Sequence, residues 1–343
     1  MRIRTSRKRQ IAGRLRKPKK RRTRKRRIKK SVPLLPAPVI PIEAVPVTPD
    51  LVKEVETDQL QLDTSHDFQA GFAKGYQEGR YAGGEAIIDQ MLPPDQMLPE
   101  VTVEQIIAAG ISMYREHSLP LLTVEQVGDQ IIHALDEQQP LSLVRLGDGE
   151  LLTLAQEIVM PVETVRREGK FLDYAGVKVP DLDIRDRLAE AVLRADIVGI
   201  PRTRMPNYQP LVSPVFRAYG IPFAERQWTD SLINYGLCQA GYLMRILRNR
   251  RVLVIGNMAE PLSAVLTGYG IAIAGMITPV NGARDAARIV ELARHYDFDM
   301  ALVSAGIAAV LITEELARLT GKVAIDFGHM ANAIVKGEAP ITE

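Results

Sequence analysis

Two carboxylates, one residue apart, follow a short apolar run near the middle of this 343-residue chain. The run Leu141–Leu146 is rich in β-forming residues, it breaks at Gly147, and Asp148 and Glu150 precede a second apolar run. This pattern predicts a strand, a sharp turn and a helix. Ligands bind at the carboxyl ends of strands in open α/β sheets. Two hard oxygen ligands at such an edge suit Mg²⁺ or Mn²⁺, and the ion would in turn hold a diphosphate.

A plainer interpretation of the same residues is structural. Asp148 could cap the following helix, with Glu150 in its first turn, where the helix dipole favours a negative charge. A capping box on Asp148 would need its Glu at position 151, which is leucine, and Gly149 is a poor opening residue for a helix. Spacing alone leaves both interpretations open.

Strands and helices alternate strictly in the last third of the chain. The predicted strands are Arg251–Ile255, Ile271–Ile277, Met300–Val303 and Val323–Asp326, with helices to about Thr267 and over Ala283–Tyr296 and Ile307–Leu319. Earlier predicted elements are a strand over Asp196–Ile200 and helices over Leu151–Ile158, Ile184–Arg194 and Ser231–Leu247. Two helices between Thr102 and Leu135 are expected to cover the sheet, and loops between Val162 and Val179 to cross its active face. The fold class is therefore α/β, with a doubly wound, mostly parallel, Rossmann-like sheet.

Small or polar residues follow each strand of the last third, namely Gly256-Asn257, Asn281-Gly282, Ser304-Ala305-Gly306 and Gly328-His329. Such residues let a phosphate approach the backbone N–H groups at helix starts. None of these turns forms Gly-x-Gly-x-x-Gly, which disfavours a dinucleotide dehydrogenase. Arg145 and Arg202, each at the end of a predicted strand, can serve anionic substrate groups or remain ordinary surface arginines.

The overall charge of +3 hides a division of the chain into two parts. Met1–Lys30 holds 18 Lys and Arg and no acid, so the rest has 44 − 18 = 26 basic and 41 acidic residues, a balance of −15. Cys238 is the only cysteine, which excludes an internal disulfide. No apolar run is long enough to span a bilayer. We expect a cytoplasmic protein, associated with an anionic surface through its basic part.

Composition predicts four regions: a disordered basic tail (1–31), a Pro-rich linker (32–66), a Gly-repeat helix or connector (67–98) and an α/β domain (99–343). The tail, Arg2–Lys30, would bind a polyanion such as RNA, DNA, an anionic membrane or a glycopolymer without sequence specificity. Glycines recur every four residues over Gly71–Gly83, beside an equally regular aromatic stripe. That geometry permits close helix packing and hence a homo-oligomer, although a flexible connector is the alternative.

Two stretches of the chain resemble the GT-D glycosyltransferases, a bacterial group. VRLGDGE (Val144–Glu150) is similar to that family's Arg-Phe-Gly-Asp-Gly-Glu signature, and VAIDFGHM (Val323–Met330) to its Ile-Asp-Ile-Gly-His ending. TPVNGARDA (Thr278–Ala286) is similar to its Pro-x-x-Asn-Ala segment, and the resemblance covers roughly residues 121–335. It implies a hexosyltransferase that moves a sugar from a nucleotide-diphosphate-sugar, such as a UDP-sugar, to a glycan or surface glycoprotein acceptor.

The resemblance also implies a site. It makes Asp148 and Glu150 the ligands of a divalent metal and makes Arg145, Asn281 and His329 site-lining residues. Asp326, the other acid at a strand end, is a candidate general base or a partner of His329. The full set of candidate residues is Asp148, Glu150 and Asp326 for catalysis, Asp148 and Glu150 for metal, and Arg145, Gly147, Arg202, Gly256, Asn257, Asn281, Ser304, Gly306 and His329 for substrate.

One departure from the family pattern favours a different function. Where members carry Gly-Pro-Thr-Ala-Lys, this chain has Gly306-Ile307-Ala308-Ala309-Val310 and so lacks the lysine. The alternative is a non-catalytic nucleotide-binding scaffold that binds polyanions through its tail and self-associates through Gly71–Gly83. A different phosphate-handling enzyme on the same sheet is a third alternative.

Overall fold

The computed structural model describes residues 64–342. The predicted basic tail lies outside these residues, as does the predicted linker except for its end, which belongs to the first helix. The chain divides into two units, residues 1–86 and 87–343. In the first unit, α1 (Thr64–Arg80) continues into the π-helical turn η1 (Tyr81–Glu85). Nothing lies within 4 Å of the Cβ positions of Gly71, Gly75 and Gly79, so the glycine stripe of this helix is open.

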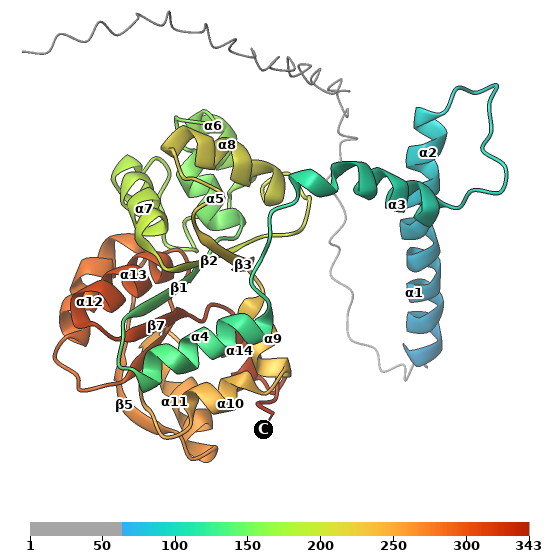
Figure 1. Cartoon of the computed structure of the whole chain (residues 1–343). Coiled ribbons are helices and arrows are strands. Elements are labelled where there is room, and N and C mark those ends of the chain that lie inside the picture. Colours follow the sequence, from blue (N-terminus) through green and yellow to red (C-terminus); the bar gives the residue numbers. More distant parts are fainter. Residues whose placement is uncertain (1–63, 343) are drawn as a thin grey trace, which may run out of the picture. The chain divides into compact units, whose positions relative to one another are not determined.

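A seven-stranded parallel sheet forms the centre of the second unit (Figure 1). Its strands are β1 (Leu141–Arg145), β2 (Ile197–Ile200), β3 (Gln227–Asp230), β4 (Arg251–Gly256), β5 (Ala272–Ile277), β6 (Met300–Ser304) and β7 (Val323–Asp326). Their order is β3-β2-β1-β7-β6-β4-β5, and every paired neighbour is parallel. The predicted fold class is confirmed.

Helices cover both faces of the sheet (Figure 1). One face carries α5 (Asp148–Ala155), α6 (Val162–Glu168), α7 (Leu182–Arg194), α8 (Gln209–Tyr219), η3 with α12 (Ala283–Asp285, Ala286–Ala293) and α13 (Ala308–Thr320). The other carries α4 (Val124–Asp136), α9 (Ile233–Gln239), α10 (Tyr242–Leu247), α11 (Ala259–Gly268) and α14 (Met330–Val335). Alternate residues of one strand enter opposite cores, as Leu302 and Val303 do in β6. Burial on both faces explains why the strands are continuously apolar.

Three predicted elements differ from the structure. The predicted helix Ser231–Leu247 is two helices, because Gly241 adopts φ +72°, a left-handed conformation that interrupts a helix. The two helices expected to cover the sheet behave differently: α4 packs on it, but α3 (Val103–Tyr114) has no buried residue. The helix after β1 begins at Asp148 and not at Leu151. Strand β3, which carries the polar pattern QWTD, was not predicted.

The remaining short elements are α2 (Ala86–Met91) and the 3₁₀ turn η2 (Arg115–His117). No helix among the described residues is long and apolar enough to cross a membrane.

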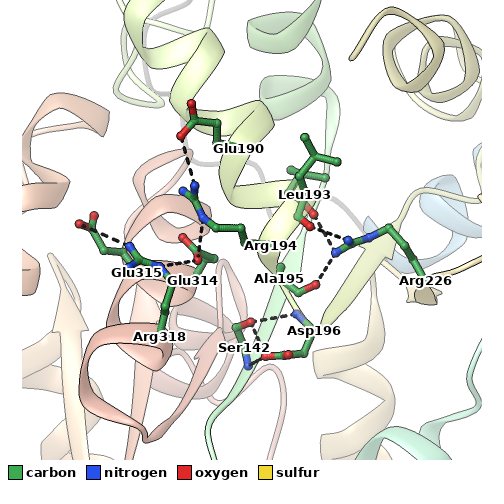
Figure 2. A network of polar contacts seen from close by, with 11 residues as sticks. Ser142, Glu190, Leu193, Arg194, Ala195, Asp196, Arg226, Glu314, Glu315 and Arg318 are labelled. Carbon is green, nitrogen blue, oxygen red and sulfur yellow. Dashed lines mark hydrogen bonds and ion pairs between the residues drawn. The ribbon is translucent and has the colours of Figure 1, made fainter. Parts of the chain in front are cut away.

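Hydrogen bonds and ion pairs stabilise the edge of the sheet at which the strands begin (Figure 2). The Asp196 carboxylate accepts hydrogen bonds from the Ser142 backbone N–H and hydroxyl, each at 2.8 Å, which joins the starts of β1 and β2. Nearby, the buried Glu314 of α13 accepts bonds from the guanidinium groups of Arg194 and Arg318, each at 3.0 Å. This edge is opposite the one where the chemistry is predicted.

The strand order places a topological switch point at the carboxyl edge between β1 and β7. The helix that follows β1, α5, packs in one core, and the helix that follows β7, α14, packs in the other. Adjacent strands whose following helices leave in opposite directions open a crevice, and ligands of doubly wound sheets bind there. Arg145 ends β1 and Asp326 ends β7, so both lie at this switch point.

Candidate active site

An ion pair joins the two strands at the switch point. The Arg145 guanidinium donates from Nη2 to Asp326 Oδ1 at 3.0 Å and from Nε to the Asp326 carbonyl at 2.9 Å. The Arg145 backbone N–H donates to Asp326 Oδ2 at 3.2 Å, and Nη1 donates to the Ser231 carbonyl at 3.0 Å. Arg145, predicted as a substrate ligand, is therefore engaged with the protein, and it holds both oxygens of the Asp326 carboxylate.

The turn after β7 fits closely around this arginine. Gly328 has φ +50°, and a Cβ at this position would overlap the Arg145 guanidinium. Asn234, which is buried, donates from Nδ2 to the Phe327 carbonyl at 2.8 Å, and its Oδ1 lies 3.5 Å from Arg145 Nη1. Ser231, which directly follows β3, and Asn234, in α9, were not selected by the sequence analysis, because both lie in a segment predicted only as an apolar helix.

The two carboxylates of the central motif lie in the first turn of α5. Gly147 is the N-cap residue, so the Glu150 side chain is three residues on, and its Oε2 accepts the Gly147 backbone N–H at 2.8 Å. Asp148 Oδ1 accepts the Gly149 N–H at 3.0 Å. The structural interpretation of the motif therefore applies to Glu150, which caps the turn, while Asp148 is a helical residue and not the cap.

Burial and like charge shift the acids of this site. Desolvation, with repulsion from Asp326, raises the pKa of Glu150 to about 7, although the Gly147 N–H and Arg145 oppose the shift. Burial also raises the pKa of Asp326, against the opposing effect of Arg145. Glu150 and Asp326 lie near one guanidinium, and Asp148 shares the helical turn of Glu150, so the site is short of positive charge. A cation that binds there would relieve the repulsion.

Tyr208, at the start of α8, completes this group of residues. Its side chain faces Asp148, and burial together with the negative charges of Asp148 and Glu150 raises the pKa of the Tyr208 phenol. The sequence analysis did not select it. The signal available was its place at the end of the polar segment that follows β2.

Two further candidates lie at the margin of the group. His329 is exposed, and its charge lowers the pKa of the adjacent Asp326. Arg202, in the loop after β2, is exposed and lies 3.6 Å from the Asp230 carboxylate. Because neither is enclosed, both remain accessible to a ligand at this edge.

A loop of the protein occupies the turns that were predicted to bind phosphate. This segment, residues 169–179, is called the strap here. The Ala283 N–H donates to the Gly176 carbonyl at 2.9 Å, and the Ile307 N–H donates to the Ala175 carbonyl at 3.3 Å. Gly306 has φ +55° and no room for a Cβ beside that carbonyl. Two backbone donors at the ends of β5 and β6 are thus used within the chain, as the loop expected across this face requires.

The other candidates at these strand ends serve the backbone. Asn257 Oδ1 accepts the Val280 N–H at 2.9 Å, and Gly256 packs against the Ser304 carbonyl. Asn281 is exposed, and its N–H donates to Asp285 at 3.0 Å. The hydroxyl of Ser304 is buried without a hydrogen-bond partner. The structure therefore separates the candidates into a group around Arg145, Asp148, Glu150 and Asp326, and a second group in the turns after β4, β5 and β6.

A family model for the GT-D fold-like domain matches residues 122–334, which contain both groups. The chain belongs to the GT-D-like family. This confirms the resemblance inferred from the motifs, and the chain carries a GT-D type glycosyltransferase fold.

Three solved structures are similar to part of this chain. A glycosyltransferase (DUF1792) from Streptococcus sanguinis is 18% identical, with 65% of this chain and 86% of that chain covered and a TM-score of 0.44. A structure described as the highly conserved domain of unknown function 1792 with a distinct glycosyltransferase fold is 18% identical over 67% and 86%, with a TM-score of 0.45. A selenomethionine-substituted domain of unknown function 1792 is 17% identical over 66% and 85%, with a TM-score of 0.43. A comparison with curated protein sequences finds no match.

The donor set fits a divalent metal that is shared with a substrate. Among residues 64–342, no group of three or more His, Cys, Asp or Glu side chains could hold an ion by itself. Mg²⁺ and Mn²⁺ commonly bind through one or two carboxylates plus substrate phosphates. Asp148 and Glu150 supply such a pair, and the excess of negative charge beside them favours a cation.

Proposed function

We propose that this protein is a metal-dependent glycosyltransferase that moves a hexosyl group from a UDP-sugar or similar donor to a glycan or glycoprotein acceptor. One observation carries the proposal: Asp148 and Glu150 share the first turn of α5 at the switch point of a GT-D-like sheet. That crevice is where a doubly wound sheet binds nucleotides, and the carboxylate pair suits the metal ion that accompanies a diphosphate.

Asp148 and Glu150 would hold the divalent metal, which supplies Lewis-acid stabilisation of the leaving diphosphate. Arg145 favours the ionised form of Asp326 against the effect of burial and fixes the carboxylate in place, since it donates to both carboxylate oxygens. This pairing makes Asp326 a positioning residue rather than a free general base. His329 and Arg202, exposed at the same edge, are available to the anionic part of the donor. The Tyr208 hydroxyl beside Asp148 orients that carboxylate.

The test is thermal stabilisation of the full chain by a panel of nucleotides and nucleotide-sugars, each with Mn²⁺ and with a chelator. We expect one nucleoside diphosphate series to raise Tm only when metal is present, by an amount that follows ligand concentration over Kd. Product analysis with the stabilising donor then identifies sugar transfer.

Asp148→Asn tests the role of the motif. It is expected to abolish the metal-dependent shift and to lower transfer at least a hundredfold while the fold is retained. The matched control is Glu291→Gln, which removes an exposed charge on α12 and should behave as wild type. Absence of a shift with every nucleotide would favour the non-catalytic scaffold, and unchanged turnover in Asp148→Asn would remove the motif from the mechanism.

A further inference from the structure

A hollow of about 230 Å³ lies on the strap, and the function proposed above does not use it. Three basic side chains line the hollow, Arg166, Lys170 and Lys178, with Asp173 as the one acid. Leu172 and Val177, both buried, form its apolar floor. The lining residues come from the last turn of α6 and from the strap itself.

The three positive charges of this hollow exceed the single negative charge of Asp173. In the part of the chain that the structure describes, Lys170 and Lys178 are exposed and form no ion pair, while Arg166 donates from Nε to the Val179 carbonyl at 3.3 Å. Three like charges around one space repel each other, and an anion relieves that repulsion. The concentration of positive charge contrasts with the balance of −15 over residues 31–343.

The strap connects this hollow to the candidate active site. Phe171, between two lining residues, has its ring 3.5 Å from the Cβ position of Gly149 in the metal-binding motif. Further along the strap, the carbonyl of Ala175 accepts a hydrogen bond from the turn after β6, and the carbonyl of Gly176 accepts one from the turn after β5. A group bound in the hollow is therefore attached to the same short segment that borders the reacting edge.

Charge at the reacting edge explains why a substrate would need this hollow. In the proposed function the metal and the anionic diphosphate of the donor occupy the edge itself, so a charged group of the acceptor is best held apart from them by other cations. We propose that the hollow binds an anionic group, a phosphate or a carboxylate, of the acceptor substrate. This assignment rests on the proposed glycosyltransferase function, while the anion site itself does not.

The first experiment measures the anion site without any donor. Inorganic phosphate is titrated into the full chain in the presence of EDTA, and binding is followed by ³¹P NMR. We expect saturable binding that weakens at least fivefold in Lys170→Gln/Lys178→Gln. The charge-matched control Lys74→Gln/Lys336→Gln, on α1 and after α14, should bind as wild type. All proteins retain the basic tail, so its contribution is common to them.

A variant that is expected to tighten binding separates an effect on the anion site from a general loss of fold. Asp173→Asn removes the one acid of the hollow and should tighten phosphate binding two- to fivefold. Equal phosphate affinity in wild type, Lys170→Gln/Lys178→Gln and Asp173→Asn would overturn the anion site.

The second experiment separates an acceptor group from a free regulatory anion. If the hollow holds the acceptor, phosphate raises KM for a phosphorylated or carboxylated acceptor but not for an uncharged one, and Lys170→Gln/Lys178→Gln abolishes the effect. A change in donor hydrolysis with no change in acceptor KM would overturn the acceptor assignment in favour of a regulatory anion. Retained phosphate binding without transfer from any nucleotide-sugar would overturn the proposed function and the acceptor assignment together, and the anion site would stand.

Discussion

Arg145 determines the electrostatics of the site, because a single guanidinium faces two buried or half-buried carboxylates. It pairs directly with Asp326 and acts on Glu150 only through space. The Glu150 carboxylate instead accepts the Gly147 N–H, and desolvation raises its pKa. A bound divalent cation would remove this cost, so the site is strained electrostatically in the metal-free protein and becomes stable on loading.

Glu150→Gln is expected to stabilise the metal-free protein at high pH. The pKa of Glu150 rises from 4.5 to about 7 on folding, so its ionisation costs folding free energy as pH rises from 4.5 to 7. Gln keeps an oxygen for the Gly147 N–H without the charge. With a chelator present, the variant should exceed wild type by roughly 1–3 kcal/mol at pH 8, and the difference should vanish near pH 4.5.

Chemical denaturation of both proteins across this pH range measures the effect. Glu291→Gln, an exposed change on α12, supplies the control and should show no pH-dependent difference. A variant less stable than wild type at pH 8 would show that the Gly147 bond, and not desolvation, dominates at this carboxylate.

Gly328→Ala is expected to disturb the site through contact with Arg145. The new methyl group would overlap the guanidinium and force it away from Asp326, in addition to the cost of φ +50° for alanine. Gly337→Ala is the matched control, since that glycine has φ +74° and nothing within 4 Å of its Cβ position. We expect Gly328→Ala to lose about 1–3 kcal/mol more than the control and to weaken metal-dependent donor binding. Equal losses in the two variants would show that Arg145 relaxes without penalty.

At this scale, the sequence allowed the acids at the strand ends to be selected as candidates, but not the contacts that they make. Asp148, Glu150 and Asp326 follow strand ends, and such positions are readable from local patterns. The engagement of Arg145 was not readable, because its acceptors Asp326 and Ser231 lie 181 and 86 residues away. The same holds for Gly306 and Asn281, since no local signal shows that the strap folds over those turns.

At the scale of elements, the apolar strands and the glycine-containing turns could be predicted, because both depend on the residue types within a short stretch of sequence. β1, β4, β6 and β7 are buried on both faces and read as continuous apolar runs. β3 is an edge strand with two buried residues out of four. Its sequence therefore shows neither a continuous apolar run nor a regular alternation of apolar and polar residues, and the strand was not predicted. The order of the strands depends on long-range pairing and was not predicted.

Glu314→Gln should destabilise the fold without an effect at the site. Its Oε1 accepts one bond from Arg194 of α7 and one from Arg318 of α13, and the side chain is 3% exposed. A neutral amide leaves the two guanidinium groups with a weaker acceptor, for a loss of about 1–3 kcal/mol. Glu315→Gln, 30% exposed and 4.0 Å from Arg318, should cost less than about 0.5 kcal/mol.

Denaturation midpoints and donor binding are measured on both of these variants. Donor affinity should remain as in wild type, because this network holds the amino edge of the sheet (Figure 2). Equal stability of the two variants would show that the buried carboxylate gains nothing from its two partners.

At the scale of the whole molecule, the sequence separates a strongly basic N-terminal segment from an acidic remainder. Residues 2–30 hold the 18 basic residues, and the remaining part, with its balance of −15, repels polyanions. The family model matches residues 122–334 and therefore does not include this tail. Polyanion binding by the tail stays a prediction from composition, since attraction between clustered cations and a polyanion needs no defined structure.

Deletion of residues 2–30 should abolish polyanion binding and leave catalysis intact. The full chain is expected to bind mixed-sequence single-stranded DNA, with an affinity that falls by at least tenfold between 50 and 200 mM salt because each neutralised phosphate releases a counterion. The matched control deletes residues 32–60 of the Pro-rich segment, which has the same length but little positive charge. DNA binding by the variant that lacks residues 2–30, or salt-independent binding by the full chain, would contradict electrostatic binding of polyanions through the tail. An unchanged kcat of the tail-deleted protein with a soluble acceptor would show that the tail serves only to localise the enzyme. A tail that took part in transfer would alter turnover when it was removed.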